Sequence, residues 1–317
     1  LRTLSTFPVL PKKGLHAARG GPQVRGMGYV PRGRLLVVGG DDGFLALVDP
    51  RRGTIAKRLP GHRATDPVDG GIDARVFTPS FSADGRLMAT ASRNGIVRLW
   101  ALPSGRPVGR PLRYAPMSRA SSRSPGVGDV SLSPDGRLLA VTRPPTGGVQ
   151  ILDAATLRRR ASLSQAKTVW DLARFTPDGR YIVAGSYKGW VRLWSTETWR
   201  PVSGVFTGPA GRVEWESTSP DGRTLATGGP DGAVRLWDLR TQQPLGAPLP
   251  GVPNRAVAPQ FTPDGAYLFA VTNAGRAFRW DVRPSSWASH ACKVAGRPLT
   301  RTEWNDVLPG RDYNPAC

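Results

Sequence analysis

The stretch TSPDGRTLATGGPDGAVRLWD, residues Thr218–Asp238, contains the pattern that decides the fold. A Pro-Asp-Gly-Arg turn is followed by a short apolar strand at Thr224–Thr227. In such a turn the Asp side chain bonds back to the backbone and Gly supplies a positive φ. A second tight turn, Asp231-Gly232, is a strong hairpin signal. The strand Val234–Trp237 then alternates, which predicts one buried and one polar face.

Five further segments of the chain repeat this pattern. They read YVPRGRLLVVGGDDGFLALVD from Tyr29, FSADGRLMATASRNGIVRLWA from Phe81, LSPDGRLLAVTRPPTGGVQILD from Leu132, FTPDGRYIVAGSYKGWVRLWS from Phe175 and FTPDGAYLFAVTNAGRAFRWD from Phe261. The turn glycines are spaced by 52, 51, 43, 43 and 43 residues, at Gly33, Gly85, Gly136, Gly179, Gly222 and Gly265. More polar segments between the repeats, such as RPVGRPLR (106–113), suit an outer edge strand. Four strands in about 43 residues correspond to one blade of a β-propeller.

These segments resemble the WD40-repeat family. The closing Trp-Asp pair of that family stands at Trp237-Asp238 and Trp280-Asp281, and is altered at Trp100-Ala101, Trp194-Ser195, Leu152-Asp153 and Val48-Asp49. The Gly-His pair of the family occurs once, at Gly61-His62. The buried His–Ser/Thr–Trp hydrogen-bond network that the resemblance implies is therefore expected to be absent from most repeats. The resemblance covers roughly residues 3–282 and implies an all-β, WD40-type β-propeller that binds partners.

The domain organisation follows from the repeat. We expect a propeller over residues 1–282 with six four-stranded blades; a seventh supplied by sequence upstream of Leu1 is the alternative. The last repeat lacks its own outer strand, so the N-terminal strand, residues 1–10, is predicted to close the last blade. Residues 283–317 form a short helical extension. Its helices are predicted in SSWASHACKVAG (285–296), which ends at Gly296, and in LTRTEWNDVL (299–308), with a capping box from Thr300 to Glu303.

The extension resembles the C-terminal ends of large actinobacterial WD40 proteins with upstream STAND-type NTPase or regulatory modules. The chain begins with Leu rather than Met, so we expect a fragment. The resemblance implies the C-terminal sensor module of a bacterial signalling protein, which can bind the upstream domains of its own polypeptide. No run approaches the roughly 18 apolar residues of a membrane helix, and we expect a cytoplasmic protein that does not bind membranes. Cys292 and Cys317 either form a disulfide or are both reduced; the sequence leaves this open.

The net charge is +21, with a pI near 11.3. A balance this basic suggests nucleic acid or another acidic partner. Only six of the 44 basic residues are Lys, however, and the arginines are scattered along the whole chain. That skew is typical of a GC-rich genome. A nucleic-acid-associated scaffold is therefore the alternative function rather than the main one.

The sequence contains no recognisable catalytic or metal-binding motif. The three histidines, His16, His62 and His290, lie far apart. No His/Cys cluster has metal-ligand spacing, and neither a nucleophile elbow nor a phosphate loop occurs. We therefore expect neither enzymatic activity nor a cofactor.

Acidic side chains suggest where a partner binds. Most of the 23 carboxylates occupy the turns or strand ends of the repeat, but several lie in first strands of consecutive repeats, near two tryptophans. In a propeller this strand lines the central channel. The expected partner-binding residues are Asp129, Asp171, Glu214, Glu216, Trp170 and Trp215. Carboxylates beside tryptophans suit a cationic peptide, through charge and cation–π contact. The alternative is that these carboxylates pair with arginines of the chain, such as Arg174 and Arg212.

Overall fold

A computed structural model of the chain describes most of the sequence. The described residues are 24–40, 43–62, 75–114, 127–142, 148–165, 168–202, 204, 206–207, 211–249, 257–272, 276–298, 300–307, 310 and 312–313. They divide into two compact units: Leu1–Phe175 with Thr196–Trp199 (unit 1), and Thr176–Ser195 with Arg200–Cys317 (unit 2). The fourth repeat is divided between the units, because its first strand belongs to unit 1 and its later strands to unit 2.

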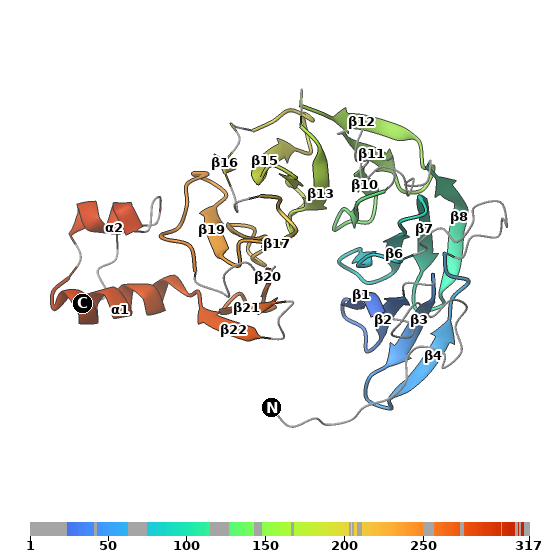
Figure 1. Ribbon diagram of the computed structural model, residues 1–317, viewed down its shortest axis with the longest axis horizontal. Helices are drawn as coiled ribbons and strands as arrows, with labels where there is room; N and C mark the ends of the chain where they lie inside the picture. The colour runs from blue at the N-terminus through green and yellow to red at the C-terminus, as the bar shows by residue number, and fades with distance from the viewer. Residues whose placement is uncertain are drawn as a thin grey trace. The chain divides into compact units, whose positions relative to one another are not determined.

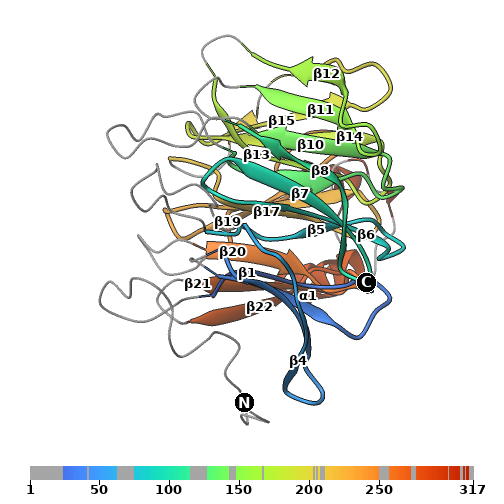
Figure 2. The same cartoon turned by 90° about the vertical axis from the view of Figure 1, so that its right-hand side faces the viewer.

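Unit 1 contains three four-stranded antiparallel sheets, each in chain order (Figure 1). The first is β1(Val24–Tyr29), β2(Leu36–Gly40), β3(Leu45–Asp49) and β4(Thr54–Arg58). The second is β5(Ser80–Phe81), β6(Leu87–Ala91), β7(Ile96–Ala101) and β8(Arg106–Arg113). The third is β9(Val130–Leu132), β10(Leu138–Thr142), β11(Val149–Asp153) and β12(Arg159–Leu163), and Figure 2 shows β10, β11 and β12 side by side. Strand β13(Trp170–Phe175) completes the unit.

Unit 2 contains the remaining strands and both helices. Its strands are β14(Tyr181–Ser186), β15(Trp190–Ser195) and β16(Phe206–Thr207), then β17(Trp215–Thr218), β18(Thr224–Gly228) and β19(Val234–Asp238), then β20(Val257–Phe261), β21(Tyr267–Thr272) and β22(Ala277–Asp281). The helices are α1(Pro284–Ala295) and α2(Arg301–Val307). Beyond β19, single bridges join Val234 to Leu249 and Trp237 to Pro244, where the repeat predicts an outer strand.

The predicted turns form through the same hydrogen bonds in five repeats. A Ser or Thr hydroxyl donates to the Asp carboxylate two residues later, at 2.5–2.6 Å, and accepts the backbone N–H five residues later; the residues are Ser82, Ser133, Thr176, Ser219 and Thr262. The turn glycine then has a positive φ, as at Gly85. The first repeat has Arg32 where the others have Asp, and there Arg32 itself has φ 55°.

The third strands of the second to fifth repeats keep partly exposed positions between buried ones, whereas β22 of the sixth repeat has no buried residue. In β7 the burial pattern leaves Arg98 and Ala101 partly exposed, while Trp100 is fully buried. The apolar residues of β6 and β7 pack with those of β9 and β10 in one core of unit 1. In unit 2, residues of β18 and β19 pack with those of β20 and β21, and Trp287 of α1 covers this core.

Serine hydroxyls join the first strands of neighbouring sheets within each unit. In unit 1, Ser80 accepts the backbone N–H of Leu132 at 2.8 Å, and Ser131 accepts that of Phe175 at 3.1 Å. In unit 2, Ser217 accepts the N–H of Phe261 at 3.2 Å. The sheets also approach closely at Gly228 of β18, where a Cβ would lie 2.2 Å from the carbonyl oxygen of Val257.

Both helices form where the sequence places them. Helix α1 ends before Gly296, which has φ 66°. At the start of α2, the Thr300 N–H donates to the Glu303 carboxylate at 2.9 Å, and the Glu303 N–H donates to the Thr300 hydroxyl at 3.3 Å. This is the predicted capping box. The expected strand at residues 1–10 lies outside the described residues.

Candidate functional site

Two of the predicted binding residues lie close together in unit 1. Asp129 precedes β9 and Asp171 lies in β13, and Thr142 at the end of β10 connects them. The Thr142 hydroxyl accepts the Asp129 N–H at 2.7 Å and donates to the Asp171 carbonyl at 3.0 Å. The Asp129 side chain is buried and that of Asp171 is partly exposed. Sequence reasoning was therefore right to place these two first strands next to each other.

Arg174 forms an ion pair with Asp129. Its guanidinium lies 3.3 Å from Oδ1 of Asp129, and the second carboxylate oxygen is buried without a hydrogen bond from the described residues. Burial raises the pKa of Asp129, and the charge of Asp171 adds to this effect; Arg174 acts in the opposite direction. Asp129 is thus a buried carboxylate that pairs with Arg174, whereas Asp171 is the partly exposed carboxylate of the two.

Unit 2 holds three of the six predicted residues, around β17. Glu216 is buried, whereas Glu214 is partly exposed and accepts a hydrogen bond from Nε of Arg212 at 2.6 Å. Trp215 between them is 41% exposed. The arginine pairing weighed as the alternative is thus present for both Asp129 and Glu214.

The two predicted tryptophans differ in their exposure. Trp170 of β13 is fully buried. Trp215 presents its ring at the surface of unit 2. Of the two, Trp215 is the ring that a partner can reach.

The buried His–Ser/Thr–Trp network, which the sequence predicts to be absent from most repeats, is complete in the second repeat, around His62. Nε2 of His62 lies 2.7 Å from the Thr90 hydroxyl, which also accepts the indole N–H of Trp100 at 2.8 Å. Nδ1 lies 2.9 Å from the Ser92 hydroxyl, and Ser92 donates to Asn94. The fifth repeat keeps only the bond from Trp237 to Thr227, at 3.0 Å. The Gly-His pair was the available sequence signal, and it correctly marks the one repeat with a histidine.

The directions of these hydrogen bonds define the state of His62. Because the Thr90 oxygen already accepts from Trp100, its proton can go to Nε2; Nδ1 then carries the ring proton and donates to Ser92. Burial, assisted by the charge of Arg98, lowers the pKa of His62 to about 3. The imidazole is therefore neutral and structural at pH 7.

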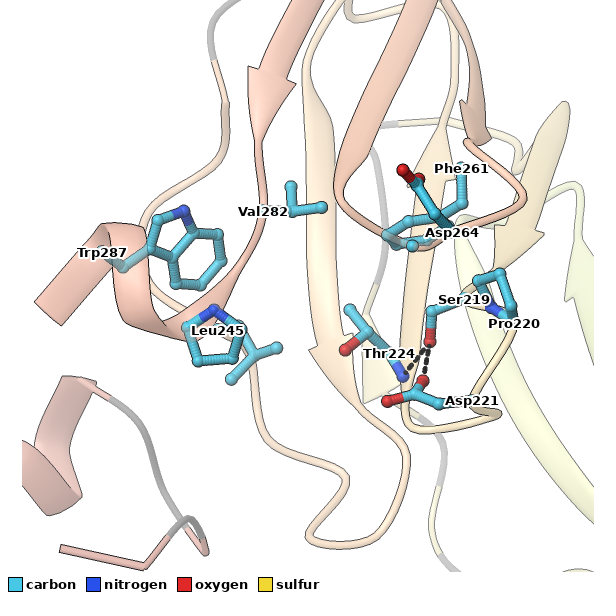
Figure 3. A pocket seen from close by; sticks show the side chains of 11 residues that line it. Ser219, Pro220, Asp221, Thr224, Leu245, Phe261, Asp264, Val282 and Trp287 are labelled. Carbon is cyan, nitrogen blue, oxygen red and sulfur yellow. Dashed lines mark hydrogen bonds between the residues drawn. The ribbon is translucent and has the colours of Figure 1, made fainter. Parts of the chain in front are cut away.

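A pocket of about 440 Å³ lies in unit 2, between the turns of its last two repeats and helix α1 (Figure 3). Trp287, Leu245 and Val282 form an apolar wall, and Asp221 lies near the opposite wall. Each turn carboxylate at the pocket is held by its own turn: Asp221 accepts from Ser219 and Asp264 from Thr262. The indole N–H of Trp287 is likewise used internally, by the Asp281 carbonyl at 2.7 Å. These polar groups of the pocket thus form hydrogen bonds with other groups of the protein.

Metal and disulfide chemistry receive no support from the described residues. Within them, no group of three or more His, Cys, Asp and Glu side chains is arranged to hold a metal. Cys317 and the side chain of Cys292 lie outside the described part, so their pairing stays a prediction. No described helix is long and apolar enough to cross a membrane.

Comparison with known families agrees with the repeat pattern. The family model described as WD40 (WD domain, G-beta repeat) matches residues 53–101, 158–195 and 202–238. These three segments of the chain are similar to WD40 repeats. Each matched segment ends on a third strand with the sequence Val-Arg-Leu-Trp, in β7, β15 and β19. WD40 repeats generally act as non-catalytic scaffolds for protein–protein interaction. The search of curated proteins found no match for this chain.

Proposed function

We propose that the chain is a non-catalytic interaction scaffold, a WD40-type propeller of six blades over residues 1–282 with a helical extension over residues 283–317. The N-terminal strand, residues 1–10, completes the last blade. The observation that carries the proposal is the recurrence of the WD40 pattern, in sheets whose outer strands are polar and exposed. The resemblance of the extension to actinobacterial STAND-associated proteins further supports a sensor module of a larger bacterial signalling protein.

The proposed partner is a cationic segment of a protein, or of the upstream part of the same polypeptide. Asp171 in unit 1 supplies accessible charge, supported by the buried Asp129. In unit 2, Trp215 has an exposed ring, and its chain neighbours Glu214 and Glu216 are partly exposed and buried, respectively. Because Arg174 and Arg212 already bind two of these carboxylates, a partner has to compete with them. Selectivity would then come from geometry rather than from net charge.

The test is a pull-down from host lysate with the full chain as bait, with and without nuclease and at two salt concentrations. The comparison is wild type against the double variant Asp171→Ala/Glu214→Ala, with Asp306→Asn on α2 as an exposed acidic control. A discrete protein that survives nuclease and moderate salt, and is lost only in the double variant, supports the proposal. Equal recovery by all three baits contradicts the proposed site.

A second candidate function is a nucleic-acid-associated scaffold. Its basis is a set of exposed arginines on or beside the outer strands of unit 1 that make no ion pair with a described carboxylate: Arg51, Arg58, Arg106, Arg110, Arg113, Arg158 and Arg159. Binding of this kind loses affinity steeply with salt, in proportion to the phosphates neutralised. Recovery of only nuclease-sensitive and salt-sensitive material would favour this candidate over the first.

A further inference from the structure

The third strands of three repeats carry an arginine at the same position, and its surroundings differ between repeats. The arginines are Arg98, Arg192 and Arg235, each in the sequence Val-Arg-Leu-Trp. In the fifth repeat, Nη1 of Arg235 lies 2.7 Å from Oδ2 of Asp231, the first residue of the preceding Asp-Gly turn. This repeat supplies its own counter-ion.

The second repeat has lost that counter-ion. The position of Asp231 is occupied by Asn94, which is neutral. Its amide donates to the His62 carbonyl at 2.9 Å, and its oxygen accepts from Ser92 at 2.5 Å. Asn94 is therefore committed to the His62 network and offers no charge to Arg98.

A second arginine lies beside Arg98 instead of a carboxylate. Arg113 pairs with Ile96 at the end of β8, and the register of the two strands shifts next to Arg98, between Val97 and Leu99. Burial lowers the pKa of Arg98, and the like charge of Arg113 lowers it further. Among the described residues, no carboxylate forms an ion pair with either arginine, and Nε of Arg98 is buried without an acceptor.

Within the described part of the chain this arrangement costs free energy, because two guanidinium groups repel each other and one has a donor with no partner there. The guanidinium of Arg98 lies 5.9 Å from the centre of the fully buried Trp100 ring. An oxyanion between the two arginines would reduce the repulsion, through a contact such as the one that Nη1 of Arg235 makes with Asp231. Charge-assisted bonds of this kind are roughly twice as strong as neutral ones.

We propose that Arg98 and Arg113 form a binding site for an acidic peptide, with a carboxylate of the partner in the place that Asp231 takes beside Arg235. The fifth repeat shows that a carboxylate fits an arginine at this position. An acidic peptide is favoured over a nucleic acid because the site offers two neighbouring arginines, one of them partly buried, rather than a row of exposed ones. It also agrees with the general role of WD40 repeats in protein–protein interaction. The site is separate from the carboxylates of the first strands, so the two proposals stand or fall independently.

The experiment measures fluorescence anisotropy of a labelled decapeptide that contains consecutive Asp and Glu residues, with the Asn/Gln version as the uncharged control. The full chain is compared with Arg98→Gln, Arg113→Gln and Arg106→Gln. Arg106 lies at the other end of β8 and is exposed, so its variant is a control with the same loss of charge. We expect wild type to bind only the acidic peptide. Arg98→Gln and Arg113→Gln should each weaken binding about tenfold or more, and Arg106→Gln less than twofold.

Three results would overturn the proposal. One is no binding of the acidic peptide by wild type. Another is an equal loss in all three variants, which would mean that the general positive charge attracts the peptide. The third is tighter binding of a DNA duplex that Arg98→Gln and Arg113→Gln leave unchanged, which would assign the basic surface to nucleic acid. Thermal unfolding separates a structural role: Arg98→Gln should keep or raise the melting temperature, and a fall of several degrees would also contradict the site.

Discussion

The neutral, buried His62 makes the stability of the protein depend on pH in a predictable direction. Its folded pKa is about 3, against 6.5 in the unfolded chain. Between these values the unfolded chain binds a proton at this position and the folded protein does not. Stability is therefore highest above pH 6.5 and falls as the pH decreases toward 3.

The size of the effect follows from the shift. At pH 5, about 1.5 units below the unfolded pKa, the free energy of unfolding should be about 2 kcal/mol lower than at pH 7 on account of His62 alone. The variant His62→Gln loses the bonds to Thr90 and Ser92, so it should be about 2–4 kcal/mol less stable at pH 7. It should also lack the His62 contribution to the pH dependence.

Urea unfolding followed by tryptophan fluorescence, at pH 7 and pH 5, measures both quantities. The other titrating groups are present in wild type and variant alike, so the difference between their two pH responses isolates His62. The expected difference is about 2 kcal/mol. An equal loss of stability in wild type and His62→Gln would refute the assignment of a buried, neutral imidazole.

Three further substitutions test other parts of the structure by the same unfolding measurement. Asp129→Asn should raise the free energy of unfolding at pH 7 by up to about 1 kcal/mol, because burial raises the pKa of this carboxyl and disfavours its ionised form. This gain should vanish in acid, where Asp129 of the wild type is protonated. A variant that is more than about 1 kcal/mol less stable than wild type at pH 7 would contradict the prediction. Thr227→Val removes the acceptor of the Trp237 indole and should cost about 1–2 kcal/mol; no change would mean that this bond does not form. Gly228→Ala should cost more than about 2 kcal/mol, because its Cβ meets a backbone carbonyl, whereas Gly204→Ala, with open space around it, should cost less than half as much.

The repeat pattern predicted the second and third strands of each repeat because those strands depend on local chemistry. The Asp-Gly turns, the alternation in Val234–Trp237 and the capping box at Thr300 all involve residues within five positions of each other. Such signals are visible in a single sequence, and the second and third strands and both helices formed where the pattern placed them.

The candidate site was less predictable because its contacts join residues far apart in the chain. Asp129 and Arg174 are 45 residues apart, and His62 and Ser92 are 30 apart. The sequence showed which carboxylates the repeat leaves over, but not which arginine faces each of them. It also could not show that Trp170 is buried while Trp215 is exposed, since both follow the same strand pattern.

The serine bonds between neighbouring first strands have a consequence for how such a chain can grow. Each of these bonds forms a joint between two repeats: one repeat supplies the serine hydroxyl and the next supplies the backbone N–H. The bonds from Phe175 to Ser131 and from Phe261 to Ser217 are examples, and each joins residues 44 positions apart. A tandem duplication of the third repeat, which contains both the Leu132 N–H and the Ser131 hydroxyl, therefore copies both halves together, and every serine joint in the longer chain is still complete. A duplication or deletion of part of a repeat would leave one half without its complement. The joint thus makes the whole repeat the unit by which the number of sheets can change during evolution.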